Sequence, residues 1–361
     1  MKPIFIVYFL FQLALINISK AQPDYPAASF LRFTDNAQTL GIADIGTVAT
    51  EENSSSALTY NPALLVRNRA QLVTSISYIP LMRALVPGMY FANAGVYFSL
   101  DKKNSWGYNF SYLNEGDYII RGKTVKLFNI NQTLRYARAI TDKISIGLGL
   151  NHLNRRLPVF FLRENNFAGD FGLNYRSFLQ ISAKSRLRIN LGGALLNLGP
   201  KVSEWGLPPN FIQGYLPSTL QIGIMTGLIK TIEEDKMLSL HLAYQIQKYM
   251  FPTELAPQMS ALNAIVHSFS SEPGGLNVKE LVHQLGMEGA IDMGKTRITG
   301  RSGTFIEKSL YLGQSYVSTG LGITYSEFSF DFAYVFPLMK RNHLANTLCL
   351  TIAKRILIAK T

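Results

Sequence analysis

The sequence predicts an all-β fold: a transmembrane antiparallel β-barrel of about fourteen strands with an N-terminal plug segment. Three observations lead to this prediction. From Gln71 almost to the C-terminus, apolar and polar residues alternate with period two, as in strands whose two faces meet different surroundings. After residue 21, no stretch reaches the roughly 18–20 continuous apolar residues of a membrane helix. The alternating runs are about 9 to 14 residues long, which suits a tilted membrane-spanning strand.

Residues 1–21 are predicted to be a secretory signal peptide. Lys2 supplies an early positive charge, residues 4–16 are mostly apolar, and Ser19-Lys20-Ala21 offers small residues where a signal peptidase reads. A membrane anchor is the alternative, for which the apolar run is short. The mature chain, 22–361, would form one outer-membrane barrel domain, with the plug at 22–66 and the barrel at 67–361.

The plug prediction rests on the irregular stretch before the first strand. It holds an amphipathic run that includes Asp44 and Gly46, a polar piece at 51–56, and the turn Asn61-Pro62. Irregular backbone at membrane depth is stable only where protein or water satisfies its polar groups. Because Pro62 holds Asn61 extended and Asn61 can bond local backbone, we expect this turn to close the plug. The expected partners on the barrel wall are Ser145, Arg188, Asn190 and Asp331.

The strand pattern is clearest at Glu327–Phe336, where aromatic residues alternate with Ser329, Asp331 and Ala333. A soluble sandwich would also alternate. The uniformly large apolar faces, the small or polar opposite faces with Arg188 and His241, and tyrosines near run ends favour a membrane barrel. The predicted strands are 71–79, 88–100, 105–120, 124–140, 143–155, 168–181, 186–198, 217–229, 237–249, 283–293, 295–304, 311–324, 326–336 and 345–357. The tyrosines near the ends of these runs are Tyr78, Tyr90, Tyr118, Tyr249 and Tyr325.

The longest insertion between strands is the segment 251–283. It contains a predicted helix at 261–269 and a second short one around Val278–Val282. Long connections of outer-membrane barrels lie on the cell exterior, and long structured loops are where binding tends to reside.

The composition gives no sign of enzymatic or nucleic-acid chemistry. The formal charge is +12, but no Lys/Arg run exceeds two residues, so no nucleic acid is expected as a partner. The five histidines include no pair at metal-ligand spacing, and no Gly-x-Ser-x-Gly or phosphate loop occurs. We therefore expect no catalytic residue, metal or cofactor. His152 and His241 are most simply strand histidines that face the lumen or a loop.

Five segments together resemble the PorV family (the PorV/PorQ group), outer-membrane barrels of the type IX secretion system of Bacteroidetes. The motif positions are Tyr78, Pro80 and Arg83 in the third segment, and Phe269, Pro273, Gly274 and Gly275 in the fourth. The five segments are 43–50, 60–63, 77–86, 268–275 and 344–348. Leu81 stands where the family pattern has Trp, and the C-terminus lacks a terminal aromatic, so a divergent paralogue is expected.

The resemblance implies a non-enzymatic secretion component of the outer membrane. Such a protein would bind secreted cargo through the cargo's C-terminal signal domain and deliver it to the attachment machinery, with 251–283 as the candidate partner-binding loop. Its surroundings would be outer-membrane lipid, lipopolysaccharide and other type IX components. The group has also been linked to removal of lipid A acyl chains, for which the sequence offers no residues. The alternatives are a FadL-like transporter of hydrophobic small molecules, which needs a lateral gap or an apolar tunnel, and a purely structural barrel.

Overall fold

The computed structural model describes the chain in thirteen pieces, each with defined backbone. These are residues 27–48, 55–68, 70–82, 86, 88–120, 123–156, 163–203, 213–250, 260–269, 281–307, 314–339, 342 and 344–356. The predicted signal peptide, Arg83, Pro273, Gly274 and Gly275 lie outside these residues.

Fourteen antiparallel strands of the described chain close into one barrel, because β1 pairs with both β2 and β16. The predicted strand count is confirmed, and the predicted run 295–304 corresponds to a strand. The barrel strands are β1 (Leu72–Pro80), β2 (Tyr90–Ser99), β3 (Asn104–Ile120), β4 (Lys123–Ala139), β5 (Ile144–Arg156), β6 (Arg163–Ser182), β7 (Ser185–Leu198), β10 (Thr219–Glu233), β11 (Lys236–Tyr249), β12 (Val282–Met293), β13 (Thr296–Ile306), β14 (Tyr316–Tyr325), β15 (Phe328–Pro337) and β16 (Leu348–Ile356).

The barrel wall is apolar outside and polar or small inside. On β15, Phe330 and Phe332 are 43% and 46% exposed, whereas Ser329 and Asp331 between them are 1% and 3% exposed. A soluble protein would bury its large apolar face, so this exposure has a simple reason only where lipid covers the outer surface. Arg188 and His241 lie buried on the inner face, as predicted, but His152 faces outward and stacks on Phe167 at 5.0 Å.

Aromatic rings gather in rows on the outer wall. Tyr78, Tyr90, Tyr112 and Phe128 lie on four successive strands, with neighbouring ring centroids 5.4, 6.0 and 5.8 Å apart. Trp106 and Tyr136, near the other end of β3 and β4, lie 4.9 Å apart. Amphipathic rings at both ends of a barrel match the two interfacial girdles of a membrane protein.

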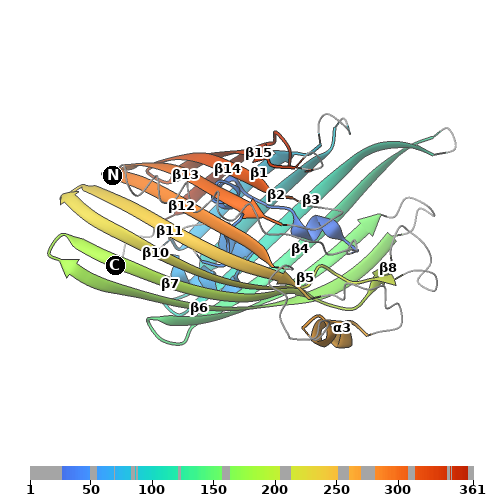
Figure 1. Ribbon diagram of the computed structural model, residues 1–361, viewed down its shortest axis with the longest axis horizontal. Coiled ribbons are helices and arrows are strands. Elements are labelled where there is room, and N and C mark those ends of the chain that lie inside the picture. Colours follow the sequence, from blue (N-terminus) through green and yellow to red (C-terminus); the bar gives the residue numbers. More distant parts are fainter. Residues whose placement is uncertain are drawn as a thin grey trace.

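The two ends of the barrel differ in their connections (Figure 1). At one end, here the short-turn end, tight turns join the strands, for example at 183–184, 234–235 and 294–295. The other, the long-loop end, carries the longer connections, the two-stranded ribbon of β8 (Val202–Ser203) and β9 (Gln213–Gly214), and α3 (Ala261–His267). In Figure 1 the short turns lie at the left, and α3 and β8 at the right.

The helix predicted at 261–269 is α3, which ends two residues earlier than expected. The second predicted helix, around Val278–Val282, is wrong at its described end because Val282 already belongs to β12 and pairs with Gln247 of β11. Among the described residues, no helix is both long enough and apolar enough to cross a membrane.

The hydrophobic core lies inside the barrel, between the wall and the N-terminal segment, defined here as residues 27–48 and 55–67. This segment folds into η1 (Ser29–Arg32), α2 (Ala37–Leu40), η2 (Ser55–Leu58) and η3 (Pro62–Arg67). Leu58, Leu64 and Leu65 pack against Val73 and Tyr97 of the wall. Ile42, Ile45 and Val48 pack in the same way against Met225 and Ala243.

Candidate functional site

The N-terminal segment lies in the lumen, and inward side chains of many strands bind its irregular backbone. Donors on the wall reach its carbonyl oxygens: Ser145 Oγ donates to Ala63 O at 2.8 Å, and Gln284 Nε2 donates to Ala43 O at 3.1 Å. Wall oxygens also accept from its amides, as when Thr47 N donates to Gln245 Oε1 at 3.0 Å. These contacts come from β5, β12 and β11, so the segment is held from several sides.

Ser145 and Asp331, which were predicted as wall partners, both contact the segment. Ser145 binds Ala63, and Asp331 accepts from Gln38 Nε2 at 3.0 Å. Asn190, which was also predicted to bind the segment, accepts from Asn174 within the wall.

Asn61 joins three pieces of chain at the predicted turn. Its backbone is extended (φ −138°, ψ 103°), as a residue before proline prefers, and it caps η3 by accepting from Ala63 N at 3.0 Å. Its amide nitrogen donates to Thr47 O at 2.9 Å and to Leu173 O of β6 at 3.1 Å. Asn61 is fully buried, so each of these bonds replaces one to water.

Two glycines permit the closest approaches around this turn. A Cβ on Gly172 of β6 would lie 2.2 Å from Asn61 Oδ1. A Cβ on Gly46 would lie 2.1 Å from the ring of Tyr60. The inward glycine of β6 therefore admits the N-terminal segment.

Asp44 and Asp35 place two carboxyl groups of this segment within the barrel. The hydroxyl of Tyr60 donates to Asp44, and the hydroxyl of Thr59 donates to Asp35. Burial raises the pKa of each carboxyl to about 6, against the effect of these hydrogen bonds. Both groups therefore change charge close to neutral pH.

Buried ion pairs cross the inner wall at two places. Arg301 donates to Glu288 at 2.8 Å and to Asp331 at 2.7 Å, and all three side chains are at most 3% exposed. Arg135 donates to Asp170 at 2.7 Å and to the carbonyl oxygen of Thr59 at the same distance.

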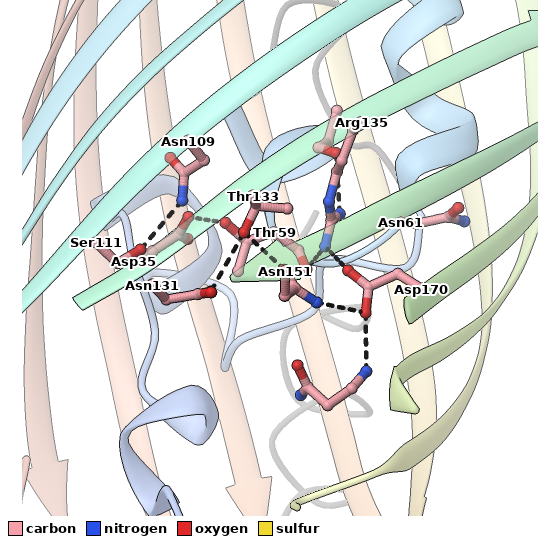
Figure 2. Close-up of polar contacts among 12 residues, drawn as sticks. Asp35, Thr59, Asn61, Asn109, Ser111, Asn131, Thr133, Arg135, Asn151 and Asp170 are labelled. Atoms are coloured by element: carbon pink, nitrogen blue, oxygen red, sulfur yellow. Dashed lines mark hydrogen bonds and ion pairs between the residues drawn. The ribbon is translucent and has the colours of Figure 1, made fainter. Parts of the chain in front are cut away.

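A directed chain of hydrogen bonds starts at Asp170 (Figure 2). Since its carboxylate only accepts, Asn151 must present its amide nitrogen, at 3.0 Å. Asn151 Oδ1 then accepts from the Thr133 hydroxyl at 2.7 Å, so Thr133 accepts from Asn131 Nδ2 at 3.2 Å. This order leaves Asn131 Oδ1 without a donor among the described residues. Asn109 and Ser111 continue the polar row onto β3.

This polar row lines one wall of a chamber of about 710 Å³, a volume that includes open solvent. Asp35, Asp44, Thr59 and Tyr60 line it from the N-terminal segment, and Phe30, Phe33 and Phe91 add aromatic rings. The chamber suits water or a polar ligand. It differs from the apolar tunnel that transport of a hydrophobic molecule would need.

Arg32 fixes the N-terminal segment to the long-loop end. Its Nε donates to the Tyr249 hydroxyl at 2.9 Å, its guanidinium lies 4.4 Å from the centre of that ring, and its Nη2 pairs with Glu307. Tyr249 ends β11 and Glu307 follows β13, so one side chain spans two strand ends.

The candidate partner loop is described at α3 and its flanks. Ser260 caps the helix by accepting from Asn263 N, and Ala264 is buried. Leu262 and Val266, one turn apart, are 71% and 65% exposed. Phe269 is half-buried, with the Lys248 ammonium 5.6 Å from its ring centre.

Tyr78 and Pro80 are the other family-motif positions that the structure describes, and both belong to β1. Tyr78 faces outward within the aromatic row, and Pro80 ends β1, where its carbonyl oxygen accepts from Thr347. Among the described residues, no group of three or more His, Cys, Asp or Glu side chains could hold a metal ion.

Sequence reasoning missed most of the charged lumen groups, including Asp35, Arg32 and Glu307. A signal existed for Arg135 and Asp170, because each is a charged residue at an inward position of a predicted strand. Their partners follow from the strand register, which the sequence pattern leaves open.

Comparisons with known proteins agree with the barrel. A family model described as type IX secretion system protein PorV matches residues 22–256, more than half of the chain. No curated protein matches the sequence.

Three solved structures illustrate what this chain is similar to in fold. The CymD monoaromatic hydrocarbon channel has a TM-score of 0.48 and 12% identity, over 89% of this chain and 97% of that one. A Pseudomonas aeruginosa FadL homologue has a TM-score of 0.45 and 10% identity, over 90% of this chain and 98% of that one. LpxR from Salmonella typhimurium has a TM-score of 0.41 and 7% identity, over 79% of this chain and 100% of that one.

Proposed function

The chain belongs to the PorV family of type IX secretion system proteins, and on that premise we propose that it receives secreted cargo at the cell surface without acting as an enzyme. It is an outer-membrane β-barrel, so its short-turn end faces the periplasm and its long-loop end the exterior. In this proposal it binds the cargo's C-terminal signal domain at the long-loop end and passes the cargo to the attachment machinery.

The observation that carries the proposal is the exposed apolar pair on α3. Leu262 and Val266 share one face of a helix on the exterior side, while Ala264 is buried. Apolar side chains one turn apart are the usual anchors of a helix in a partner's groove. Losing water from both upon docking would favour binding by about 1.5 to 3 kcal/mol per side chain.

The contents of the lumen also support a receptor over a conduit. Atoms of the N-terminal segment approach the inner wall closely at Gly172 and Gly192, where an added Cβ would lie 2.2 and 2.1 Å away. We propose that this segment is a plug that closes the lumen, with Asn61-Pro62 as its exit turn. Cargo would then contact the surface loops rather than pass through the barrel.

The test is co-purification from outer membranes. The double substitution Leu262→Asp/Val266→Asp should abolish recovery of type IX components and of cargo C-terminal domains with the tagged barrel. Asn263→Asp, on the same helix, is the matched control and should retain recovery. Equal recovery with the double variant and the wild type, with both barrels inserted, would refute docking on α3.

Uptake of hydrophobic small molecules is the alternative function, for which the chamber beside the N-terminal segment would have to serve as the binding space. Its polar lining and the packed segment are unfavourable for such a ligand. Loss of fatty-acid or aromatic-compound uptake upon gene deletion, with secretion intact, would establish this function instead.

A further inference from the structure

Arginine side chains meet at the periplasmic end of β6 and β7. Arg176 Nη1 donates to the carbonyl oxygen of Arg67 at 3.4 Å. The guanidinium carbons of Arg176 and Arg186 lie 5.8 and 5.0 Å from the ring centre of Phe178. Two guanidinium groups therefore flank one exposed aromatic ring, at the end where the turn 183–184 joins the two strands.

Alternation along β6 puts this cluster on the luminal side of the rim. Gly172 and Asn174 face inward, so Arg176 and Phe178, two and four residues beyond Asn174, continue the same face. Arg67 ends η3 of the N-terminal segment and is 6% exposed. The cluster thus joins the segment to the rim at the level of the periplasmic head groups.

Two of the guanidinium groups have hydrogen-bonding capacity left over. Arg67 uses Nε on Ser145 and Nη1 on the main-chain oxygen of Asp142, but its buried Nη2 has no acceptor in the part of the chain that the structure describes. Arg186 has no side-chain acceptor among the residues that the structure describes. A buried donor on a charged group is costly when unpaired, so an anion at this place would stabilise it.

The positive charge around the arginine cluster also favours an anion at this place. Burial, and then the charge of Arg176, lowers the pKa of Arg67 to about 10, and Asp142 opposes this change. Exposed Lys143 and Lys184 lie in the adjoining turns and add to the positive potential. Among the described residues, Asp142 is the one carboxylate that acts on Arg67.

We propose that Arg67, Arg176 and Arg186 form a binding site for a phosphate group at the periplasmic rim, with Phe178 as its apolar floor. Planar guanidinium groups present paired N–H donors that match phosphate oxygens. The phosphate can belong to a phospholipid of the inner leaflet or be free in the periplasm. The exposed ring of Phe178 offers an apolar surface beside the charges, which favours a lipid.

The test uses the full-length barrel purified in detergent. Calorimetry with inorganic phosphate and native mass spectrometry after incubation with phosphatidylglycerol measure the two sources separately. Wild-type protein should bind one or both, and Arg176→Gln/Arg186→Gln should weaken binding about tenfold or more, since each charge-assisted bond is worth about a factor of ten. Binding of phosphatidylglycerol without binding of inorganic phosphate would identify a membrane phospholipid as the ligand. Binding of inorganic phosphate alone would identify free periplasmic phosphate as the ligand.

Arg138→Gln is the matched control, because Arg138 lies near the same end of the barrel but faces outward and is exposed. Arg186→Gln alone removes no hydrogen bond to the described residues, so it keeps the test valid if the double variant folds poorly. The proposal is overturned if wild type binds neither probe or if Arg138→Gln weakens binding as much as Arg186→Gln. It is also overturned if a polyglutamate peptide binds the cluster and phosphate does not.

Discussion

The side-chain amide of Asn61 donates to the carbonyl oxygen of Thr47 at 2.9 Å, so the two halves of the N-terminal segment are tied together inside the barrel. The same amide reaches Leu173 O on β6. One buried side chain therefore links the segment to itself and to the wall.

Asn61→Ala should loosen the segment without unfolding the barrel. It removes three hydrogen bonds of a fully buried side chain, at a local cost of about 2–4 kcal/mol. Protease cleavage within 31–64 should become faster in intact outer membranes. Asn68→Ala, which removes one bond to Leu65 O, should change cleavage little. Rapid cleavage of the wild type would contradict the plug proposal.

Gly172→Ala should destabilise the protein by about 1–3 kcal/mol through overpacking. The new methyl group would lie 2.2 Å from Asn61 Oδ1. Gly169 on the same strand is the control, because a Cβ there meets nothing closer than 3.9 Å. The denaturant midpoint of Gly172→Ala should be lower than that of Gly169→Ala. Equal midpoints would contradict close packing of the N-terminal segment against β6.

Arg301→Gln should cost about 3–5 kcal/mol because it leaves two buried carboxylates, Glu288 and Asp331, without their cation. Arg297→Gln is the control. Its pair with Asp292 is about a fifth exposed, so its loss should cost at most about 1 kcal/mol. Both costs can be read from denaturant unfolding, and similar values for the two variants would refute the ranking.

The carboxyl groups of Asp35 and Asp44 should make the segment less stable at neutral than at acidic pH. Their folded-state pKa values, about 6, are raised above the ordinary 3.8, so the folded protein holds their protons longer. Their contribution is therefore complete below about pH 4 and is lost as pH rises to about 6, by up to about 3 kcal/mol each.

Hydrogen exchange in residues 35–48 should consequently speed up between pH 4 and pH 6 beyond the intrinsic rate. Asp35→Asn/Asp44→Asn should remove most of this excess. Asp117→Asn, an exposed carboxylate on β3, should leave it unchanged. An excess that persists in the double variant would assign the effect to other groups.

The strands were predictable because lipid and lumen impose opposite demands on alternate residues. Most predicted strands agree with the structure within about two residues, and 124–140 against Lys123–Ala139 is one example. β6 begins at Arg163, whereas the predicted strand began at residue 168. The prediction missed the first residues because Arg163 to Asn166 are polar on both faces and break the alternation. Such a strand end is fixed by pairing with β5, from Arg156 opposite Arg163 onward.

The charged lumen contacts were not predictable to the same extent. The inward position of Asp331 follows from alternation, but its partner Arg301 is set by the order β13-β14-β15 around the barrel. The clamp of Arg32 on Glu307 joins residues 275 positions apart. No local pattern encodes that contact, because it depends on how the N-terminal segment lies in the lumen.

The most direct test of the central claim is site-specific photo-crosslinking in living cells. A photoreactive residue at position 262 or 266 should crosslink to cargo C-terminal domains or type IX partners. The same residue at Ile119, which is 82% exposed near the tip of the β3–β4 hairpin, should not. Docking at α3 would be contradicted if crosslinks formed from position 119 only. It would also be contradicted if none of the three positions crosslinked while cargo secretion was normal.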